Sequence, residues 1–513
     1  MNFSLITMET CVVAVGLVLL LADLWLPPER KRMLGYAGAA ALGLLLLASL
    51  SGYGSCSITG TAFDGMYVQD GMSIFFKRFF LLAAIIVLVL AVEFSDRFPA
   101  GASEYYSLII FALTGMLFAA SANDFSLLFV SLELITVTFY VLTSFQRGRL
   151  VSLEAGVKYL IIGALSTAFT VYGIALIFGT AHTLKFSEVA AQGAELASNK
   201  IFLCGLLLVL VGIGFKISAF PFQIWAPDVY QGAPTPTTAF LAVGSKAAGF
   251  VLLLRLLFTA VPEVTTQWRN LLILVSGVTI LYGNLCALPQ RNVKRLLGYS
   301  GISHAGYMLL GVAALSASGQ AAVLYYLSGY LFTVLAAFTV IALVMRHLET
   351  EDVSGFAGLS QRSPLLAATM TLAMVSLAGI PPLAGFFGKF LLFKAVLQEA
   401  GSNPGYYCLT FTAIAGVVMS LYYYFGVIRA IYWSRETPNS APVPMSLPVR
   451  CTIGLCLVGM LWLGLFPGAL VNATEFAAQS LARPAHAIDV RTTAGAPTPV
   501  ESPQKTSPRI AGQ

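Results

Sequence analysis

Charged residues are scarce in this chain. Of 513 residues, 10% are Asp, Glu, Lys or Arg, whereas 58% are hydrophobic and the mean hydropathy is +0.83. A typical soluble domain carries about 25% charged residues. A fold surrounded by water could not hide so much apolar surface. The composition therefore excludes a soluble protein and indicates one whose solvent is lipid.

Several motifs are also missing. The seven cysteines form no CxxC pair and most lie in apolar runs, so we expect packing roles instead of a metal or iron–sulfur site. The first apolar run, Thr10 to Leu26, lacks a basic leader and a small-residue cleavage site, which predicts a retained helix instead of a signal peptide. The net charge of +6 is too modest to call for a nucleic-acid partner.

Long apolar runs dominate the sequence. A helix that crosses a bilayer needs about 20 predominantly apolar residues. The sequence predicts an all-α polytopic membrane protein of about fourteen such helices. We expect them at residues 8–26, 34–50, 78–95, 105–122, 125–143, 153–178, 201–222, 237–260, 270–288, 294–314, 320–346, 364–396, 405–432 and 449–470.

Basic residues are unevenly distributed between the loops. Most Lys and Arg follow odd-numbered helices, as Arg30, Lys31 and Arg32 do. The loops after even-numbered helices are expected to hold Lys77, Arg78, Lys185, Lys200 and Arg269. Cytoplasmic loops carry the excess of Lys and Arg, so both termini are predicted to face away from the cytoplasm.

The sequence contains a weak internal repeat. Lys158-Tyr-Leu resembles Tyr325-Tyr-Leu, and Ala219-Phe-Pro221 resembles Gly379-Ile-Pro381. A five-helix unit repeated in tandem re-enters the membrane from the opposite face, which gives an inverted repeat. The predicted units are residues 1–103 (helices 1–3), 104–262 (first repeat), 263–435 (second repeat), 436–475 (helix 14) and 476–513, an Ala-, Pro- and Thr-rich tail expected to be disordered.

Proline interrupts two of the expected helices. Residues 212–221 (GIGFKISAFP) contain Pro221, and residues 379–389 (GIPPLAGFFGK) contain Pro381 and Pro382. Proline removes a backbone donor and clashes with the preceding turn. The carbonyls freed inside a membrane then need a polar cavity or other protein groups. Interrupted helices at matching places in two halves indicate an ion path; an ordinary proline kink is the simpler alternative.

Five ionisable residues fall inside the apolar runs: Glu133, Lys158, Lys216, Lys246 and Lys389. A charge near mid-bilayer costs about 2.5–3.5 kcal/mol on insertion scales, so we expect these side chains to face one another or water. Burial can bring such groups into the range where they exchange protons near neutral pH. The pattern predicts a hydrated proton line across the two halves.

Other polar residues have competing interpretations. Lys158 lies near a helix start and could instead extend its ammonium to the interface. We expect Arg255 and Lys394, closer to helix ends, to do so. His304 is a candidate relay between the halves, or a hydrogen-bonded packing residue. Asp228 is predicted to lie in a loop with a structural role.

Three segments carry a resemblance to a known family. Residues 215–241 (FKISAFPFQIWAPDVYQGAPTPTTAFL), 292–307 (NVKRLLGYSGISHAGY) and 378–390 (AGIPPLAGFFGKF) resemble subunit N of bacterial NADH–quinone oxidoreductase, respiratory complex I. The resemblance covers roughly residues 1–475. The DVYxGAPTP run separates subunit N from the related subunits L and M. One departure is Gln223, where relatives usually have His, so a proton role at that position is in doubt.

The resemblance implies a function and its residues. Glu133 would pair with Lys216, and Lys158, Lys246 and Lys389 would continue a central hydrophilic axis. The chain would pump protons, driven by quinone reduction elsewhere in the complex. It would bind no cofactor itself, since NADH, FMN, the iron–sulfur clusters and quinone belong to other subunits. Its partners would be the antiporter-like subunit M and the small K and J subunits, in a bacterial inner membrane.

Two other functions stay open. A subunit of a cation/proton antiporter would share the broken helices and the lysines, and a sodium-dependent pH gradient in vesicles lacking quinone would favour it. A purely structural subunit would tolerate every buried-charge substitution yet be needed for assembly. Helices 1–3 carry no chemistry that we identify, and we expect them to pack against neighbouring subunits.

Overall fold

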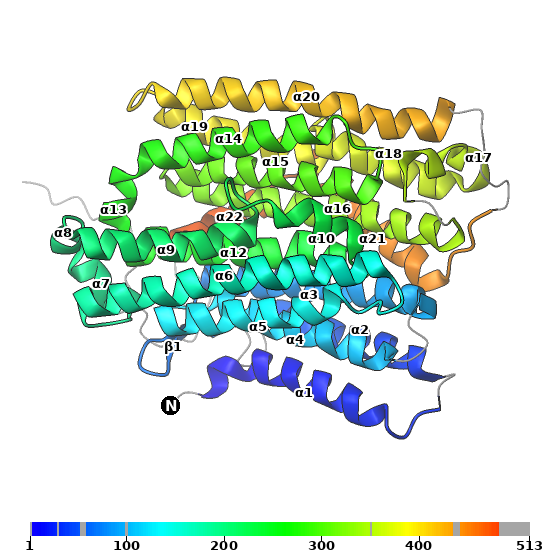
Figure 1. Ribbon diagram of the computed structural model, residues 1–513, viewed down its shortest axis with the longest axis horizontal. Helices are drawn as coiled ribbons and strands as arrows, with labels where there is room; N and C mark the ends of the chain where they lie inside the picture. The colour runs from blue at the N-terminus through cyan, green and yellow to red at the C-terminus, as the bar shows by residue number, and fades with distance from the viewer. Residues whose placement is uncertain are drawn as a thin grey trace, which may run out of the picture.

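The computed structural model describes residues 3–27, 30–51, 58–97, 101–348, 351–433 and 442–481. Helices running roughly along one common direction make up almost all of this part of the chain (Figure 1). Most of the predicted tail, residues 482–513, lies outside the described residues. The helix-forming parts of the sequence are the apolar runs, because a helix satisfies all its backbone groups within the segment.

The N-terminal part combines helices with one small hairpin. Its elements are η1 (Phe3–Ile6), α1 (Thr7–Ala22), α2 (Lys31–Leu50), β1 (Gly60–Ala62), β2 (Tyr67–Gln69), α3 (Gly71–Phe94) and η4 (Ser95–Arg97). The strands pair antiparallel, with Thr61 opposite Val68. Asp70 caps α3: its carboxylate accepts from Ser73 N at 2.8 Å, and Ser73 Oγ accepts from Asp70 N at 2.7 Å.

Two longer series of helices follow. The first consists of α4 (Ala102–Ala120), α5 (Phe125–Thr143), α6 (Leu150–Ala181), α7 (Phe186–Ala191), α8 (Gly193–Leu196), α9 (Lys200–Ile217), α10 (Trp225–Gly232), α11 (Thr235–Phe240), the π turn η5 (Leu241–Ser245), α12 (Lys246–Arg255), the π turn η6 (Leu256–Ala260) and α13 (Pro262–Gln267). The second consists of α14 (Arg269–Ala287), α15 (Val293–Ala313), α16 (Ala317–His347), η7 (Val353–Phe356), α17 (Leu359–Arg362), α18 (Pro364–Ala378), α19 (Ala384–Glu399) and α20 (Gly405–Trp433). The chain closes with α21 (Leu447–Leu465) and α22 (Gly468–Gln479).

The predicted membrane fold is confirmed, although the exact helix count stays a prediction. Within the described residues, 12 helices are long and apolar enough to cross a membrane. The predicted runs 294–314 and 364–396 are helical as α15 and as α18 with α19, but they do not meet that length and hydropathy criterion. All residues of the most apolar 18-residue stretch of Thr235–Ala260 are buried, and 94% of those in the corresponding stretch of Ala317–Arg346 are buried. These two spans form the centre of the bundle.

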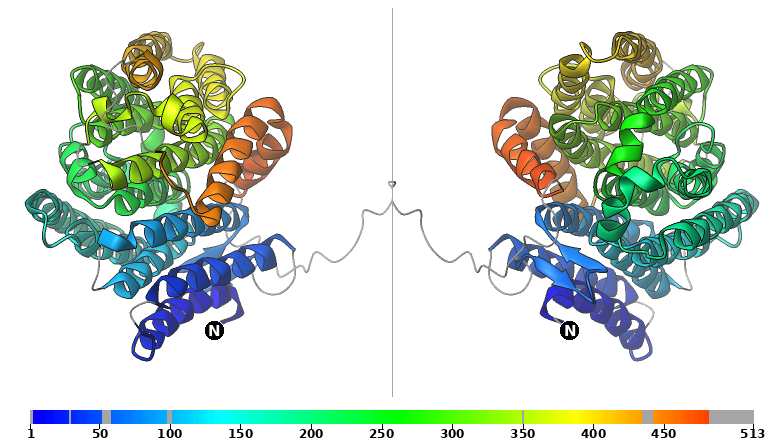
Figure 2. Two further views of the ribbon diagram at one scale, coloured as in Figure 1. Left: turned by 90° about the vertical axis from the view of Figure 1, so that its right-hand side faces the viewer. Right: turned by 90° about the vertical axis from the view of Figure 1, so that its left-hand side faces the viewer.

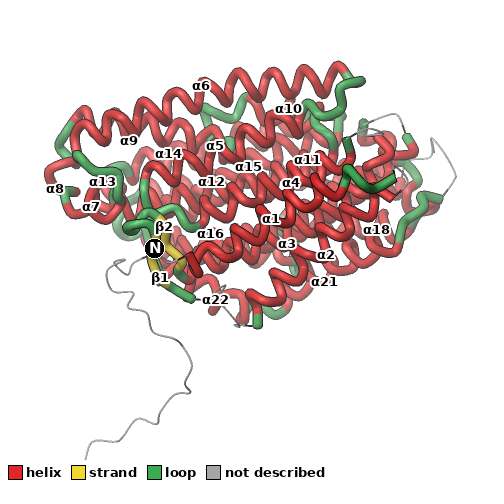
Figure 3. Tube along the Cα trace, turned by 90° about the horizontal axis from the view of Figure 1, so that it is seen from below, coloured by secondary structure: helices red, strands yellow, loops and turns green. Residues whose placement is uncertain are grey.

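Both described ends of the chain lie at the same face of the bundle. Tyr67 Oη of the hairpin donates to Leu5 O at 3.0 Å, and Met72 N donates to Ser480 Oγ at 3.1 Å. The hairpin lies beside the N-terminus in the tube view (Figure 3), and α21 and α22 flank the bundle when it is seen end-on (Figure 2). This arrangement places both described ends of the chain on one side of the bundle. We call the end of the bundle that holds them and the hairpin the N-terminal face.

Three expectations about polar residues and boundaries were wrong. Lys77 and Arg78 lie inside α3 instead of a loop, because the Asp70 cap starts that helix at Gly71. Arg255 does not reach the interface: it is 2% exposed and ion-paired with Asp70. The tail boundary at residue 476 was too early, since α22 continues to Gln479.

The second broken helix depends on a glycine at a close contact. A Cβ on Gly385 would lie 1.8 Å from Ser376 O, a backbone atom of α18. We expect Gly385→Ala to force α18 and α19 apart and to lower the amount of assembled protein several-fold, on the order of the 1–3 kcal/mol cost of overpacking. The readout is the protein's band on a native gel of detergent-solubilised membranes.

Gly426 supplies the matched control for that substitution. It lies inside α20, and a Cβ there would meet nothing within 4 Å. Gly426→Ala should assemble like the wild type. Equal amounts of the Gly385→Ala and Gly426→Ala proteins would contradict the packing argument.

Candidate functional site

The first broken helix ends in the middle of the bundle. α9 stops at Ile217, and Ser218 takes a left-handed conformation with φ of 60°. The indole Nε1 of Trp225 donates to Phe215 O at 2.9 Å, and Phe220 N donates to Thr279 Oγ1 at 3.1 Å on α14. Protein groups therefore satisfy backbone atoms at this break, as a membrane interior requires. Gln223 lies buried in the non-helical segment.

The second broken helix holds a lysine at its break. α18 ends at Ala378, followed by Gly379 with φ of 86°. The ammonium of Lys389, on α19, donates to Leu377 O at 2.8 Å and to Ala378 O at 3.0 Å. These are carbonyls that the end of a helix leaves without a helical partner. A cation is favoured at this end of a helix dipole, so the break itself makes a binding site for the Lys389 charge.

Lys216 is buried at the end of α9, next to α5. It is 1% exposed, and its Nζ donates to Thr136 Oγ1 at 2.9 Å. Glu133 lies one turn before Thr136 on α5, and its Oε1 accepts from Thr167 Oγ1 at 2.7 Å. Glu133, Thr136 and Thr167 line a shared cavity that Ser166 and Thr170 also border. No ion pair joins Glu133 to Lys216 among the described residues; Lys216 instead contacts Thr136, one turn from Glu133 on the same face of α5.

Lys246 occupies the most buried span of the bundle. It is 2% exposed and follows the π turn η5. Its Nζ donates to Gly301 O on α15 at 2.5 Å. A Cβ on Gly249 would lie 3.4 Å from both Cβ and Cγ of Lys216, so the Lys216 stem packs against α12 one turn beyond Lys246. Helix α12 thus carries Lys246 and, one turn later, the contact with the Lys216 stem.

His304 lies between the second and third lysines. Its Nδ1 and Nε2 are 2.5 Å from Tyr326 Oη and 2.9 Å from Tyr424 Oη. On α15, His304 comes one turn after Gly301 and one turn before Tyr307, so all three share one helix face. Lys246 contacts Gly301, and Lys389 Nζ lies 4.9 Å from the Tyr307 ring centroid. His304 therefore lies between the two positions that the lysines contact, Gly301 and Tyr307, which are about 9 Å apart along the axis of α15.

Lys158 lies apart from this series. Its side chain is 41% exposed on α6, and its Nζ is 2.6 Å from Glu154 Oε1 and 2.8 Å from Asp228 Oδ2. Asp228 belongs to α10, not to a loop, and its Oδ1 also accepts from Arg295 at 2.5 Å. The expectation that Asp228 lies in a loop was wrong. Asp228 on α10 thus links Lys158 on α6 to Arg295 at the start of α15.

Hydroxyl groups of the site were missed in the sequence. Thr136, Tyr326 and Tyr424 connect the charged residues, but none carries a charge that would single it out in an apolar run. The spacing offered one usable signal, because Thr136 follows Glu133 by three residues and must share its helix face. Tyr326 and Tyr424 come from α16 and α20, and only the fold brings them to His304.

The fold and the site together define a class. A bundle of apolar helices, two of them broken near its middle, holds three lysines and a histidine in a continuous buried series. Ionisable residues inside a membrane face a path for ions or protons, and helix breaks at membrane depth mark such paths. This chain is a multi-pass membrane protein of the ion-translocating class.

Comparison with known proteins identifies the family. A family model described as NADH:quinone oxidoreductase/Mrp antiporter, TM, matches residues 122–416. NADH-quinone oxidoreductase subunit N of Desulforamulus reducens is 40% identical over 480 residues, covering 93% of this chain and 98% of the relative. A chain of respiratory complex I from Thermus thermophilus is 33% identical with a TM-score of 0.76, covering 91% of this chain and 99% of that one. A chain of the Mrp complex from Dietzia sp. DQ12-45-1b shares the fold, with 20% identity and a TM-score of 0.77. The match covers 94% of this chain and 99% of that one.

The chain belongs to the NADH:quinone oxidoreductase and Mrp antiporter family, and within it to the NADH-quinone oxidoreductase subunit N proteins. It is an antiporter-like, multi-pass membrane subunit of a proton-translocating oxidoreductase in a bacterial inner membrane. Among the described residues no group of three or more His, Cys, Asp or Glu side chains could hold a metal ion.

Proposed function

We propose that protons cross this subunit along Glu133, Lys216, Lys246, His304 and Lys389, driven by quinone reduction elsewhere in the complex. One observation carries the proposal: each of these residues, or the group that it contacts, lies about one helix turn from the next along α5, α12 or α15. α5 joins Glu133 to the Thr136 contact of Lys216, α12 joins Lys216 to Lys246, and α15 joins Lys246 to Lys389 through His304.

The coupling between neighbouring sites is electrostatic. Two unit charges about 9 Å apart interact by about 2 kcal/mol at an effective dielectric constant of about 20. Between groups that close, such an energy changes a proton affinity by more than tenfold, and His304, which lies between the Lys246 and Lys389 contacts on α15, would transmit the charge state of one lysine to the other. Interacting sites of this kind titrate together. A change at Glu133 and Lys216 would thus pass to Lys246 and then to Lys389.

The two series of helices fit an inverted repeat. In the first, the long helix α6 packs against the broken pair α9 and α10; in the second, the long helix α16 packs against the broken pair α18 and α19. We infer that residues 104–262 and 263–435 are the two five-helix units, preceded by helices 1–3 in residues 1–103 and followed by helix 14 in residues 436–475. The lysines differ in place: Lys216 precedes its break and Lys389 follows its break.

The redox chemistry is assigned to other subunits. We propose that NADH, FMN, the iron–sulfur clusters and quinone bind there, and that this chain contributes proton movement alone. Its neighbours in the membrane arm would be the antiporter-like subunit M and the small K and J subunits. The exposed ion pair of Lys158 and Glu154 lies outside the buried series, so we do not include Lys158 in the path between the lysines.

Proton pumping in Lys216→Ala and Glu133→Ala variants tests the proposal. Both complexes should assemble and oxidise NADH, but the rate at which they acidify inverted vesicles should fall by about tenfold or more, because a positioned proton-transfer group commonly contributes about 10²–10⁴ in rate. Lys394→Ala is the control, since Lys394 is exposed on α19.

The other outcomes select the alternatives. Wild-type pumping in both variants would overturn the proposed path. Flux that depends on sodium in vesicles lacking quinone would indicate a cation/proton antiporter subunit. Unchanged activity in every buried-charge variant, together with loss of assembly when the chain is deleted, would indicate a purely structural subunit.

A further inference from the structure

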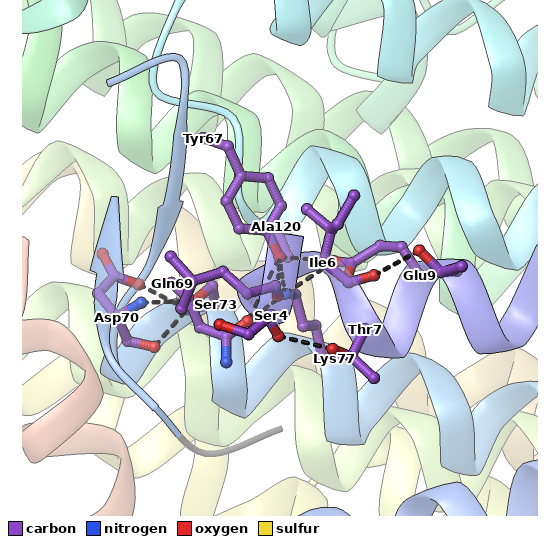
Figure 4. A network of polar contacts seen from close by, with 12 residues as sticks. Ser4, Ile6, Thr7, Glu9, Tyr67, Gln69, Asp70, Ser73, Lys77 and Ala120 are labelled. Atoms are coloured by element: carbon purple, nitrogen blue, oxygen red, sulfur yellow. Dashed lines mark hydrogen bonds and ion pairs between the residues drawn. The ribbon is translucent and has the colours of Figure 1, made fainter. Parts of the chain in front are cut away.

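A second group of buried charges lies at the N-terminal face, outside the lysine series (Figure 4). Lys77 Nζ is 2.7 Å from Glu9 Oε1, and both side chains are at most 1% exposed. Arg255 donates to both carboxylate oxygens of Asp70, at 2.8 and 3.1 Å, and both side chains are at most 7% exposed. Helices 1–3, where we expected no chemistry, supply three of these four residues.

The two pairs differ in what they can do with a proton. Arginine stays protonated in proteins, and every oxygen of Asp70 is engaged: Oδ1 accepts from Arg255 and from Ser73 N, and Oδ2 accepts from Arg255. Asp70 therefore has no free oxygen at which a proton could bind. Lysine and glutamate can both exist as neutral groups, so the Glu9–Lys77 pair is the member of the cluster that can change its charge.

Glu9 has one oxygen free to receive a proton. Its Oε1 accepts from Lys77 and lies 3.0 Å from Tyr67 Oη, whose one proton Glu9 shares with Leu5 O. Its Oε2 is buried and has no hydrogen-bond partner among the described residues. A buried acceptor without a partner costs free energy, and Oε2 is the oxygen of Glu9 that can bind a proton without displacing an existing contact. Tyr67 and Gln69 fix Lys77 from the other side, at 2.6 and 3.0 Å from Nζ.

We propose that Glu9 and Lys77 form a further proton-binding site of this subunit, in which Glu9 Oε2 takes up one proton and releases it at the N-terminal face. The resting pair, Glu9 carboxylate and Lys77 ammonium, gains one proton to give a neutral Glu9 acid beside Lys77 ammonium, and losing that proton restores the pair. The inference rests on the proposed proton path, because a proton must arrive from that path.

Position favours release at this face. Glu9 lies in the first turn of α1, between the half-buried Thr7 and the exposed Thr10. Arg255 connects the cluster to the lysine series, since it ends the helix α12 that begins with Lys246, about 13.5 Å away by helix rise. Buried charges are little screened, so a charged Lys246 disfavours the extra positive charge at Glu9 and promotes release.

The polar and charged groups around Glu9 come from β2, α3 and α12. Tyr67 and Gln69 belong to β2, Asp70 is the N-cap of α3, Lys77 lies within α3, and Arg255 lies on α12. Ser121, between α4 and α5, contributes a further buried hydroxyl. The fixed pair of Asp70 and Arg255 has no net charge, so a proton at Glu9 changes the charge of the whole cluster by one.

The double variant Glu9→Gln/Lys77→Gln, in the full complex, tests the site. Two amides can keep a hydrogen bond between α1 and α3 but cannot carry a proton. We expect NADH oxidation and assembly within twofold of wild type, and a proton-to-electron ratio in vesicles that falls to the value measured for Lys246→Met. Glu9→Asp, which keeps a carboxyl group, should restore part of the ratio.

Other results overturn one claim or the other. A wild-type ratio in an assembled double variant, alongside a lowered ratio in Lys246→Met, overturns the Glu9 site and leaves the lysine path intact. A wild-type ratio in both overturns the proposed path itself.

If the double variant does not assemble, the wild-type complex is treated with a hydrophobic carbodiimide, which modifies protonated buried carboxyl groups. Modification of Glu9 that increases in acidic buffer supports the site, and absence of modification at every pH overturns it.

Discussion

Replacing Lys246 with methionine should reduce proton pumping by the complex about tenfold or more while leaving NADH oxidation largely intact. Methionine keeps the length and apolar packing of the side chain but has no proton to exchange. Lys246 lies on the most buried span and in the middle of the series: its helix α12 packs against the Lys216 stem, and its Nζ donates to Gly301 O, one turn before His304. A positioned proton-transfer group commonly contributes about 10²–10⁴ in the rate of its own step, so a loss of tenfold or more in pumping is expected.

The measurement is the initial rate of acidification of inverted vesicles, divided by the rate of NADH oxidation in the same sample. Normal assembly is checked on a native gel. Because Met fills the same space without an unpaired charge, loss of folding is not expected. A normal ratio in the Lys246→Met complex would show that protons bypass the middle of the series.

Removing the His304 imidazole should have the second largest effect. In His304→Leu, the two tyrosines Tyr326 and Tyr424 keep their positions on α16 and α20, but the described residues between Lys246 and Lys389 then offer hydroxyl groups and no imidazole. We expect proton transfer across the subunit to slow by about tenfold or more, within the range for a lost general acid or base. Pre-steady-state acidification after a pulse of NADH reports this step.

A matched variant separates the relay from packing. Tyr326→Phe removes the hydroxyl 2.5 Å from His304 Nδ1 but leaves the imidazole in place. It should slow transfer less than His304→Leu does. Equal effects of the two variants, or normal rates in His304→Leu, would indicate that His304 is a packing residue and that the lysines interact through space alone.

The sequence predicted the parts of this site that depend on local pattern. A lysine in an apolar run is conspicuous, so Lys216, Lys246 and Lys389 were found directly. Prolines in otherwise helical segments located both breaks, and the structure shows Gly379 and Ser218 ending the helices there. The requirement that freed carbonyls find partners also followed from membrane physics.

The rest required the fold. The outward position of Lys158 depends on how α6 is rotated about its axis. Most of α6 is exposed, so its sequence does not show which side faces the bundle. Arg255 finds Asp70 from 185 residues away, which no local pattern reveals. A capping signal, Asp70 three residues before Ser73, was present in the sequence and would have placed Lys77 inside α3. Glu9 was overlooked although it lies inside the first expected helix, residues 8–26.

The most direct test of the account is the number of protons translocated per electron by the Lys246→Met complex, measured beside Lys394→Met in the same vesicles. Lys394 is an exposed lysine on the helix that carries Lys389, so it controls for loss of a charge alone. The account predicts a lowered ratio for Lys246→Met and a wild-type ratio for Lys394→Met. Wild-type ratios in both complexes would contradict the claim that the buried lysines carry protons.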